Sequence, residues 1–349
     1  MTAILSGLLL GGAGGTLCWL IGVPAPWLAG SMVAAIAGIF SGIKIGMPDW
    51  LRAVAFIFLG IQIGMTVTLD TVDRAAQWPL SIAFLGVTVV AVTWCCTAFY
   101  VKLRKWDSAT ALFASLPGAL SLVILLASET GADMRRVSIA QCIRLFFLIA
   151  ALPALISWLS TQEIHPVTAE AGGLADIGLV VVLASAAGLL LERLRVPAGL
   201  ILGPTLVSAG LELSGMIEGS APIGLLIPAN IILGVTIAAR FKDFSFAEFR
   251  QALGEGFAGF VIALAVAAMG AMITSAVADL PLALTLLAFS PGGLDAITIM
   301  AFALNLDPAY VGAHQIVRYV GMALSLPWVT SLVLRRMGVA AVRAPMADD

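Results

Sequence analysis

Charged side chains are scarce in this chain. Asp, Glu, Lys and Arg make up 11% of its 349 residues, whereas about 25% is typical of soluble domains. Hydrophobic residues make up 61%, and the mean hydropathy is +1.07. The longest polar stretch, residues 161–176, is too short to form a hydrophobic core of its own. The composition therefore excludes a soluble protein and predicts an all-α integral membrane protein.

Histidine and cysteine are also few. The two histidines, His165 and His314, leave a histidine-rich metal enzyme without ligands. Four cysteines lie within apolar runs, and their spacing fits neither a zinc site nor a disulfide framework: Cys18, Cys95, Cys96 and Cys142. No nucleophile with a nearby base is visible. We therefore expect no enzyme, no cofactor and no metal, and we interpret the cysteines as buried thiols.

Apolar segments of about 18 residues or more, each able to cross a hydrocarbon core of about 30 Å, recur along the whole chain. Two of them, 108–128 and 280–304, are interrupted near the middle by Pro117-Gly118 and by Pro291-Gly292-Gly293. The others are predicted to cross the membrane: 2–22, 27–43, 50–68, 79–101, 137–159, 174–191, 198–213, 221–239, 255–277 and 309–334.

The two interruptions belong to an internal duplication. A shift of 174 residues superimposes matching residues of the two halves: Pro117 on Pro291, Gly118 on Gly292, Gln141 on Gln315, Arg144 on Arg318 and Pro153 on Pro327. With one residue of slippage, Val23-Pro24-Ala25 falls on Val196-Pro197-Ala198. We therefore expect two membrane repeats, 1–165 and 166–335, followed by a tail, 336–349.

The placement of basic residues predicts the orientation of the repeats. If both interrupted segments crossed the membrane, eight basic residues would lie on each side, against the positive-inside rule. If both are hairpins, fifteen basic residues share one side, only Arg74 lies opposite, and Arg144 and Arg318 fall inside spans. We therefore expect an inverted repeat with both termini and the tail cytoplasmic. Each half has about five transmembrane helices plus one re-entrant or broken-helix hairpin, and the protein is a multi-pass protein of the inner (cytoplasmic) membrane.

The second interruption predicts an anion site. Ser290 fits the N-cap and Pro291 the first helical residue of the returning arm, which leaves Gly292 and Gly293 at the tip. Free backbone N–H groups and the positive end of the helix dipole at such a helix start favour anions. A proline kink in an ordinary span would explain one such interruption, but not two at equivalent positions.

Gln141 and Arg144, like Gln315 and Arg318, stand three residues apart on one face of a predicted span. An arginine within a membrane is costly and counts as functional by default. Two interpretations stay open. The guanidinium groups contact an anionic substrate, or they tie each hairpin to its neighbouring helix through a carboxylate or backbone carbonyl groups.

Asp295 has no acidic equivalent in the first half, where Ser121 takes its place. It either pairs permanently with an arginine, or it titrates or binds a cation as the coupling group. His314 stands one residue before Gln315, and we expect a satisfied, buried histidine there rather than a proton relay.

Small and polar residues elsewhere give weaker signals. Gln62 and Thr236 are equivalent polar residues within spans, which line a cavity or only bond across helices. Close helix packing is predicted at three glycines spaced four residues apart: Gly7, Gly11 and Gly15.

Three motifs carry a resemblance to a known family: PAPWLAG at 24–30, SPGGL at 290–294 and Q-x-x-R at 315–318. Together they resemble the AbrB-type membrane family, also classed as ammonia monooxygenase-like, over nearly the whole chain. The first tip departs from the motif, with LPGAL at 116–120. The resemblance implies a regulator of gene expression or an ammonia oxidase. These residues support neither label, because no nucleic-acid-binding face lies outside the spans and a copper oxygenase would lack its histidines.

Inverted repeats with paired hairpins are typical of secondary transporters, which bind substrate near the midplane. We therefore expect a transporter of a small anionic metabolite such as a carboxylate, with coupling to protons or sodium left open. The alternative is a membrane sensor or regulator that binds the same ligand without net transport and affects gene expression indirectly. The expected partners are this substrate and the lipid bilayer, with no nucleic acid, and a homo-oligomer is left open.

Overall fold

The structure, a computed structural model, is all-helical over the residues that it describes, and no strand occurs among them. The described residues are 2–67, 69, 75, 78–117, 123, 127, 130–159, 174–194, 196, 198–217, 223–304 and 306–336. Within helices, the description excludes the side chains of 174–176, 223, 294, 295, 323 and 326–336. The predicted all-α class is confirmed.

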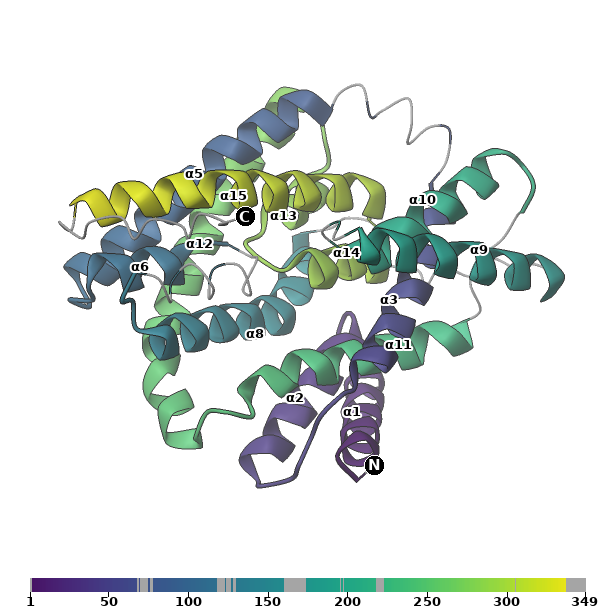
Figure 1. Cartoon of the computed structure of the whole chain (residues 1–349), viewed down its shortest axis with the longest axis horizontal. Coiled ribbons are helices and arrows are strands. Elements are labelled where there is room, and N and C mark those ends of the chain that lie inside the picture. The colour runs from purple at the N-terminus through teal and green to yellow at the C-terminus, as the bar shows by residue number, and fades with distance from the viewer. Residues whose placement is uncertain are drawn as a thin grey trace, which may run out of the picture.

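The helices follow one another in two similar series (Figure 1). The first comprises α1 (Thr2–Leu20), α2 (Pro26–Phe40), α3 (Asp49–Gly64), α5 (Trp78–Lys102), α6 (Ser108–Ser115) and α8 (Met134–Leu159). The second comprises α9 (Leu174–Arg193), α10 (Gly199–Leu213), α11 (Ile223–Ala238), the 3-10 turn η1 (Ala239–Phe241), α12 (Phe246–Ala278), α13 (Leu282–Phe289), α14 (Leu294–Ala303) and α15 (Pro308–Arg336).

In the described part of the chain, five helical segments are long and apolar enough to cross a membrane: Thr2–Leu20, Trp78–Lys102, Met134–Leu159, Gly224–Phe241 and Phe246–Ala278. Together with shorter apolar helices such as α2 and α10, they indicate a membrane protein. α12 begins at Phe246, well before the predicted start at residue 255. The reason is a capping box: the Ser245 hydroxyl accepts from the Glu248 amide, and the Glu248 carboxylate accepts from the Ser245 amide.

The two series share an unusual backbone feature. Ala25 and Ala198, the N-caps of α2 and α10, both adopt the left-handed conformation, with φ of 51° and 56°. Non-glycine residues rarely do so, because the Cβ atom crowds the backbone. These two alanines end the equivalent Val-Pro-Ala segments recognised in the sequence. The duplication therefore extends to local backbone conformation.

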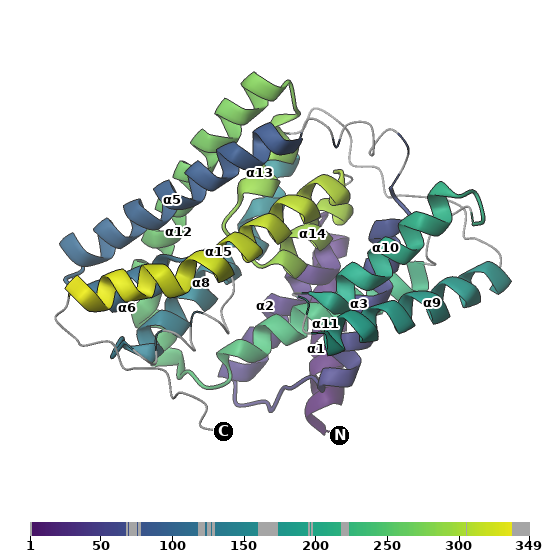
Figure 2. The same ribbon diagram turned by 45° about the horizontal axis from the view of Figure 1, so that its top comes forward.

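The helices pack as two groups, each drawn from both series (Figures 1 and 2). One group contains α1, α2, α3, α9, α10 and α11, in which α2 packs on α11 and α3 packs on α10. The other contains α5, α6, α8 and α12 to α15, in which α12 packs on both α5 and α8. The groups meet where α8 contacts α2 and where α14 and α15 contact α3.

Glycines allow unusually close packing between helices of the first group. The predicted packing glycines Gly7, Gly11 and Gly15 are the buried residues of α1. A Cβ atom built at Gly11 would lie 2.7 Å from a methyl group of Val235 in α11, and one at Gly15 would lie 2.7 Å from the Trp27 ring. The predicted close packing is therefore confirmed.

Helices α5 and α12, which hold equivalent places in the two series, run antiparallel in the second group. Tyr100 near the end of α5 lies against Gly259 near the start of α12, and Thr88 lies against Gly270 further along. The Cys96 thiol donates to the Gly259 carbonyl over 3.7 Å. The short helix α6 packs against α5 and α8, and α13 packs against α12, α15 and α8.

Candidate functional site

The second interrupted segment is a broken helix. Ser290 is the C-cap of α13, and Gly293 is the N-cap of α14. The prediction that Ser290 caps the returning arm and that Pro291 opens it is wrong. The Ser290 hydroxyl instead donates to the Leu286 carbonyl, 2.7 Å away and four residues back in α13. Pro291 and Gly292 therefore form a short bridge between two helices.

Arg318 and Gln315 on α15 hold this break through backbone carbonyl groups. Arg318 Nη1 donates to the Ser290 carbonyl over 2.6 Å, and Nη2 donates to the Gly292 carbonyl and to the Gln315 amide oxygen. Gln315 Nε2 donates to the Ala288 carbonyl, 2.9 Å away. The guanidinium group thus satisfies carbonyl groups that the end of α13 leaves without helical partners.

The first break is held in the same way from α8. Arg144 Nη2 donates to the Leu116 carbonyl over 2.9 Å, and Nη1 lies 3.4 Å from the Ala114 carbonyl oxygen. Gln141 Nε2 donates to the Phe113 carbonyl, 2.8 Å away. Pro117 is buried beyond these contacts. Gly118 and the residues to 122 lie outside the described part, so only one arm of this break is described.

Both guanidinium groups are almost enclosed. Arg144 is 8% exposed and Arg318 is 6% exposed. Each positive charge sits at the C-terminal end of a short helix, where the helix dipole is negative. Of the two interpretations left open by the sequence, the tie to backbone carbonyl groups is the contact that the structure contains for both arginines.

At the start of α14, the N-cap residue makes no side-chain hydrogen bond to the first backbone N–H groups of the helix. Gly293 supplies no side chain, and its φ of −78° and ψ of 146° are ordinary extended values. The first N–H groups of a helix lack intrahelical partners and carry the positive end of the dipole. The side chain of Asp295, the second residue of α14, lies outside the described part. The proposed coupling role of this aspartate therefore stays a prediction.

The second break lies against the helix that holds the first. A Cβ atom built at Gly292 would lie 3.1 Å from Leu148 Cδ2 and 2.7 Å from Ile297 Cγ1. Leu148 follows Arg144 by about one helical turn on α8. Ser290 is fully buried, and Pro291 and Gly292 are buried with it. The structure therefore brings the second tip close to the Arg144 helix.

His314 is enclosed between α15 and α5. Its Nε2 lies 2.8 Å from the Ser81 hydroxyl oxygen, and its Nδ1 lies 2.8 Å from the Tyr310 carbonyl oxygen. The residue is 0% exposed. The expectation that His314 is buried and hydrogen-bonded is therefore confirmed, whereas these contacts leave its role in proton transfer as a prediction. Thr236 lines a pocket of about 350 Å³, and its hydroxyl donates to the Ile232 carbonyl of its own helix over 2.7 Å.

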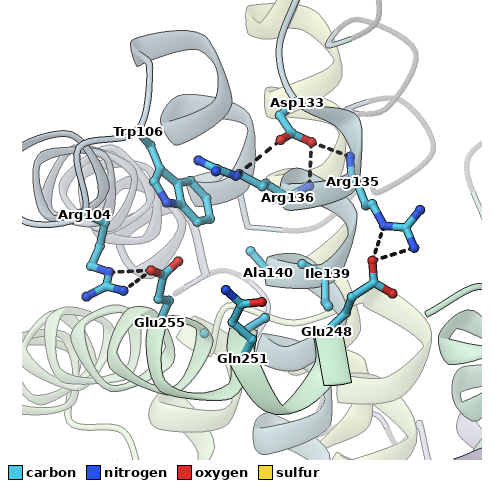
Figure 3. Close-up of a pocket in the computed structure, with 12 residues that line it drawn as sticks. Arg104, Trp106, Asp133, Arg135, Arg136, Ile139, Ala140, Glu248, Gln251 and Glu255 are labelled. Atoms are coloured by element: carbon cyan, nitrogen blue, oxygen red, sulfur yellow. Dashed lines mark hydrogen bonds and ion pairs between the residues drawn. The ribbon is translucent and has the colours of Figure 1, made fainter. Parts of the chain in front are cut away.

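A polar pocket at another end of the second group was not foreseen (Figure 3). It has a volume of about 420 Å³ and lies between the α5–α6 connection, the start of α8 and the start of α12. Arg104 Nε donates to Glu255 over 2.7 Å, and Arg135 Nε donates to Glu248 over 2.6 Å. These pairs join residues of the two series.

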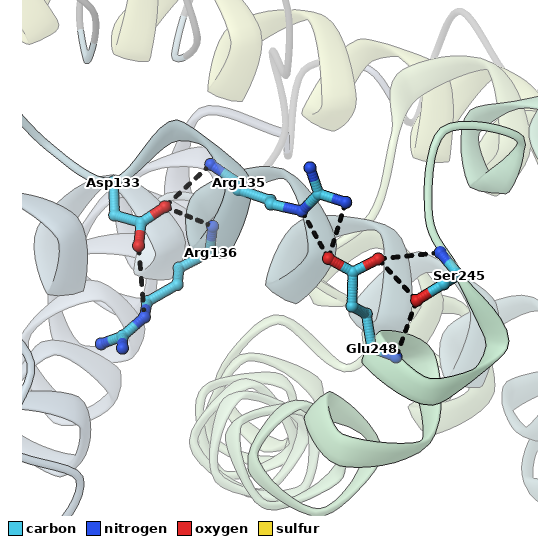
Figure 4. Close-up of polar contacts among 5 residues, drawn as sticks. All are labelled: Asp133, Arg135, Arg136, Ser245 and Glu248. Atoms are coloured by element: carbon cyan, nitrogen blue, oxygen red, sulfur yellow. Dashed lines mark hydrogen bonds and ion pairs between the residues drawn. The ribbon is translucent and has the colours of Figure 1, made fainter.

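The acidic residues of this pocket are also held by backbone groups (Figure 4). Asp133 accepts from the amides of Arg135 and Arg136, each at 3.0 Å, and Glu248 accepts from Ser245. In the sequence analysis, Arg104, Arg135 and Arg136 served only to assign one side of the membrane. The Ser245-x-x-Glu248 capping box is readable from the sequence, but pairing across 113 residues, as for Arg135 with Glu248, is not.

Metal ligands do not gather in the described part of the chain, where no group of three or more His, Cys, Asp or Glu side chains is placed to hold an ion. The cysteines are free thiols. The interpretation as buried thiols is confirmed for Cys96 and Cys142 and is wrong for Cys18 and Cys95, which are half-buried.

Comparison with known proteins places these features in a family. The family model described as "Transition state regulatory protein AbrB" matches residues 3–73 and 27–334. The chain belongs to the AbrB family. The predicted resemblance, which covered the motifs at 24–30, 290–294 and 315–318, is therefore confirmed.

Two relatives of this AbrB-family chain match over most of their lengths. "Putative regulator AbrB" of Escherichia coli (strain K12) is 27% identical over 320 residues, covering 89% of this chain and 90% of the relative. "Uncharacterized protein YhjN" of Bacillus subtilis (strain 168) is 24% identical over 346 residues, covering 90% of this chain and 89% of the relative. The residues matched by the family model, 27–334, include the positions of both Pro-Gly interruptions and both Gln-x-x-Arg pairs.

Proposed function

We propose that this AbrB-family protein is a secondary transporter of a small anionic metabolite, such as a carboxylate, and not an enzyme. The observation that carries the proposal is the pair of helix breaks, each held by a Gln-x-x-Arg pair of the following long helix. Non-helical backbone at membrane depth is tolerated where it is buried in protein or lines a cavity. Paired breaks in a duplicated membrane chain are a common plan for a substrate site.

The proposed topology is an inverted repeat with ten crossings and two hairpins. The antiparallel packing of α5 and α12 supports it, because these helices hold equivalent places in the two series. A second pocket, of about 350 Å³, also supports it: Arg52 from the start of α3 and Arg240 from η1, which directly follows α11, both line this pocket. Because the start of α3 lies beside the end of its equivalent α11, the two helices run in opposite directions. Their basic residues then lie on the same side of the membrane.

Two C-cap serines offer a direct test of the inversion. Ser41 ends α2 and Ser214 ends α10, and both are exposed. In a background with the native cysteines replaced by alanine, we expect Ser41→Cys to react with a membrane-impermeant maleimide only from the cytoplasmic side. Ser214→Cys is expected to react only from the opposite side. Reaction of both from the same side would mean that the repeats are parallel.

We assign the anion-binding role to the start of α14 and, by equivalence, to the returning arm after Pro117 and Gly118. Arg318 offsets the negative end of α13, and in this proposal the backbone N–H groups at the start of α14, which carries Asp295 in its first turn, attract the anion. Arg144 does the same for α6. In this proposal Gln141, Gln315 and the arginines act by holding the tips, and Ser290 to Gly293 form the tip that faces the substrate.

A charge introduced at Gly293 tests this assignment. Gly293→Asp is expected to weaken binding of the anionic substrate at least about tenfold, because a carboxylate at the N-cap occupies the free N–H groups and repels the ligand. Gly293→Asn is the matched control, since it caps the helix without a charge. Binding is measured by calorimetry on purified protein, with the ligand first found by a thermal-shift screen of carboxylates. Equal binding by the Asp and Asn variants would contradict an anion site at this helix start.

The alternative function is a membrane sensor, which the printed name of the Escherichia coli relative favours. Uptake of the same ligand into proteoliposomes separates the two. A transporter accumulates or exchanges the ligand under an imposed gradient, and the Gly293→Asp variant does not. Binding without flux under proton, sodium and substrate gradients would favour the sensor, with any effect on gene expression being indirect.

A further inference from the structure

The two ring nitrogens of His314 face hydrogen-bond partners of different kinds. Nδ1 faces the Tyr310 carbonyl oxygen at 2.8 Å, and a carbonyl oxygen can only accept. Nδ1 therefore carries a hydrogen. Nε2 faces the Ser81 hydroxyl at 2.8 Å, and a hydroxyl can either donate or accept.

The hydroxyl of Ser81 has a second partner that completes both protonation states. Ser81 Oγ lies 2.9 Å from the Trp78 carbonyl oxygen. When His314 is neutral, the Ser81 hydroxyl donates to Nε2. When His314 is protonated, Nε2–H donates to Ser81 Oγ, and the hydroxyl turns to donate to Trp78. Rotation of one O–H bond thus satisfies both states, which a backbone N–H in the place of Ser81 would not allow.

The surroundings of the ring contain few other ionisable groups. α5 presents Ser81 and Trp78, α13 presents Phe289, and α15 presents Tyr310, whose ring centroid lies 4.0 Å from that of His314. Of the other helices packed on α15, α3 carries Asp49 and Arg52, which pair with each other in its first turn. α14 carries Asp295, whose side chain lies outside the described part. Arg318, one turn further along α15, is engaged by the second break.

The contact between α5 and α15, here called the α5–α15 joint, is closed to solvent, whereas the equivalent contact between α12 and α8 adjoins a pocket. A shift of 174 residues relates His314 to Ala140 and Ser81 to Glu255. Both Ala140 and Glu255 line the polar pocket of about 420 Å³; Ala140 is 5% exposed and the Glu255 side chain is 25% exposed, whereas His314 and Ser81 are both 0% exposed. Equivalent joints that differ in this way are expected when one side of an inverted repeat is open and the other closed.

We propose that His314 is the coupling proton site, so that protons drive movement of the anionic substrate. This inference rests on the proposed transport function. A proton binds at Nε2 when the α5–α15 joint opens to water. When the joint closes, the protonated ring is hydrogen-bonded to Ser81. His314 precedes Gln315 and lies one turn before Arg318, so a change at the joint moves the residues that hold the second break. Asp295 stays a separate candidate for coupling.

The first test measures proton binding without any substrate. The chain has two histidines, so His165→Gln leaves His314 as its only imidazole. Histidine-selective NMR of this protein in nanodiscs is expected to show reversible titration between about pH 4 and pH 9. Ser81→Ala is expected to lower the proton affinity about tenfold, because a charge-assisted hydrogen bond is lost, and Ser81→Thr is expected to retain it. A ring that keeps one neutral tautomer throughout, or that titrates identically in Ser81→Ala, would overturn the proposal.

The second test couples the site to transport. Proteoliposomes containing a trapped pH indicator are expected to show proton uptake with substrate. His314→Gln is expected to retain substrate exchange and to lose acceleration by an imposed pH gradient, whereas Asp295→Asn retains it. Loss in Asp295→Asn but not in His314→Gln would assign the proton to Asp295. If His314 titrates but no anion is transported, only the transport function fails; if transport occurs and His314 does not titrate, only this inference fails.

Discussion

Replacement of Arg318 by Met is expected to lower the free energy of unfolding by about 3–6 kcal/mol, because two buried carbonyl groups lose hydrogen bonds from a charged donor. The carbonyl groups are those of Ser290 and Gly292, and both residues are buried, so the variant leaves two buried acceptors without their charged donor. Unfolding of the purified protein by SDS, followed by tryptophan fluorescence, measures the change.

The control for this variant is Val317→Met on the same helix. Val317 is 41% exposed and is expected to tolerate the change within about 1 kcal/mol. Arg318→Lys is expected to be intermediate, because an ammonium group lacks the fork that reaches both carbonyl groups. A stable Arg318→Met protein that binds no anion would reverse the assignment, since the arginine would then serve the ligand rather than the break.

Replacement of Gly14 by Val is expected to separate α1 from α2 and to destabilise the protein by at least about 3 kcal/mol. A Cβ atom at this position would lie 3.0 Å from the carbonyl carbon of Gly30, closer still to its oxygen, and against Ala34. Because the obstacle is backbone, no change of rotamer relieves it. The midpoint of thermal unfolding in detergent measures the effect.

Gly12 provides the matched control, two residues away on the same helix. A Cβ atom there would meet nothing within 4 Å, so Gly12→Val is expected to change the stability by less than about 1 kcal/mol. Equal loss of stability in both variants would indicate that valine disturbs α1 itself rather than its contact with α2.

The sequence by itself determined the helical membrane class, the position of the second break, the point where α6 ends at the first break, and the family, whereas the inverted repeat stays a proposal. These follow from local properties: apolar length, Pro-Gly interruptions and a constant offset of 174 residues. The packing role of Gly7, Gly11 and Gly15 was also readable, because four-residue spacing places them on one helix face.

Only the tertiary structure decided which partner each polar group takes. The sequence placed Ser290 at the start of the returning arm, but its hydroxyl bonds back into α13, because a serine can satisfy either a following amide or a preceding carbonyl. The same ambiguity applied to Arg144 and Arg318, because guanidinium N–H groups can donate to carbonyl oxygens as well as to carboxylates. The contact of His314 with Ser81 joins residues 233 apart, and chain folding alone brings such pairs within hydrogen-bond reach.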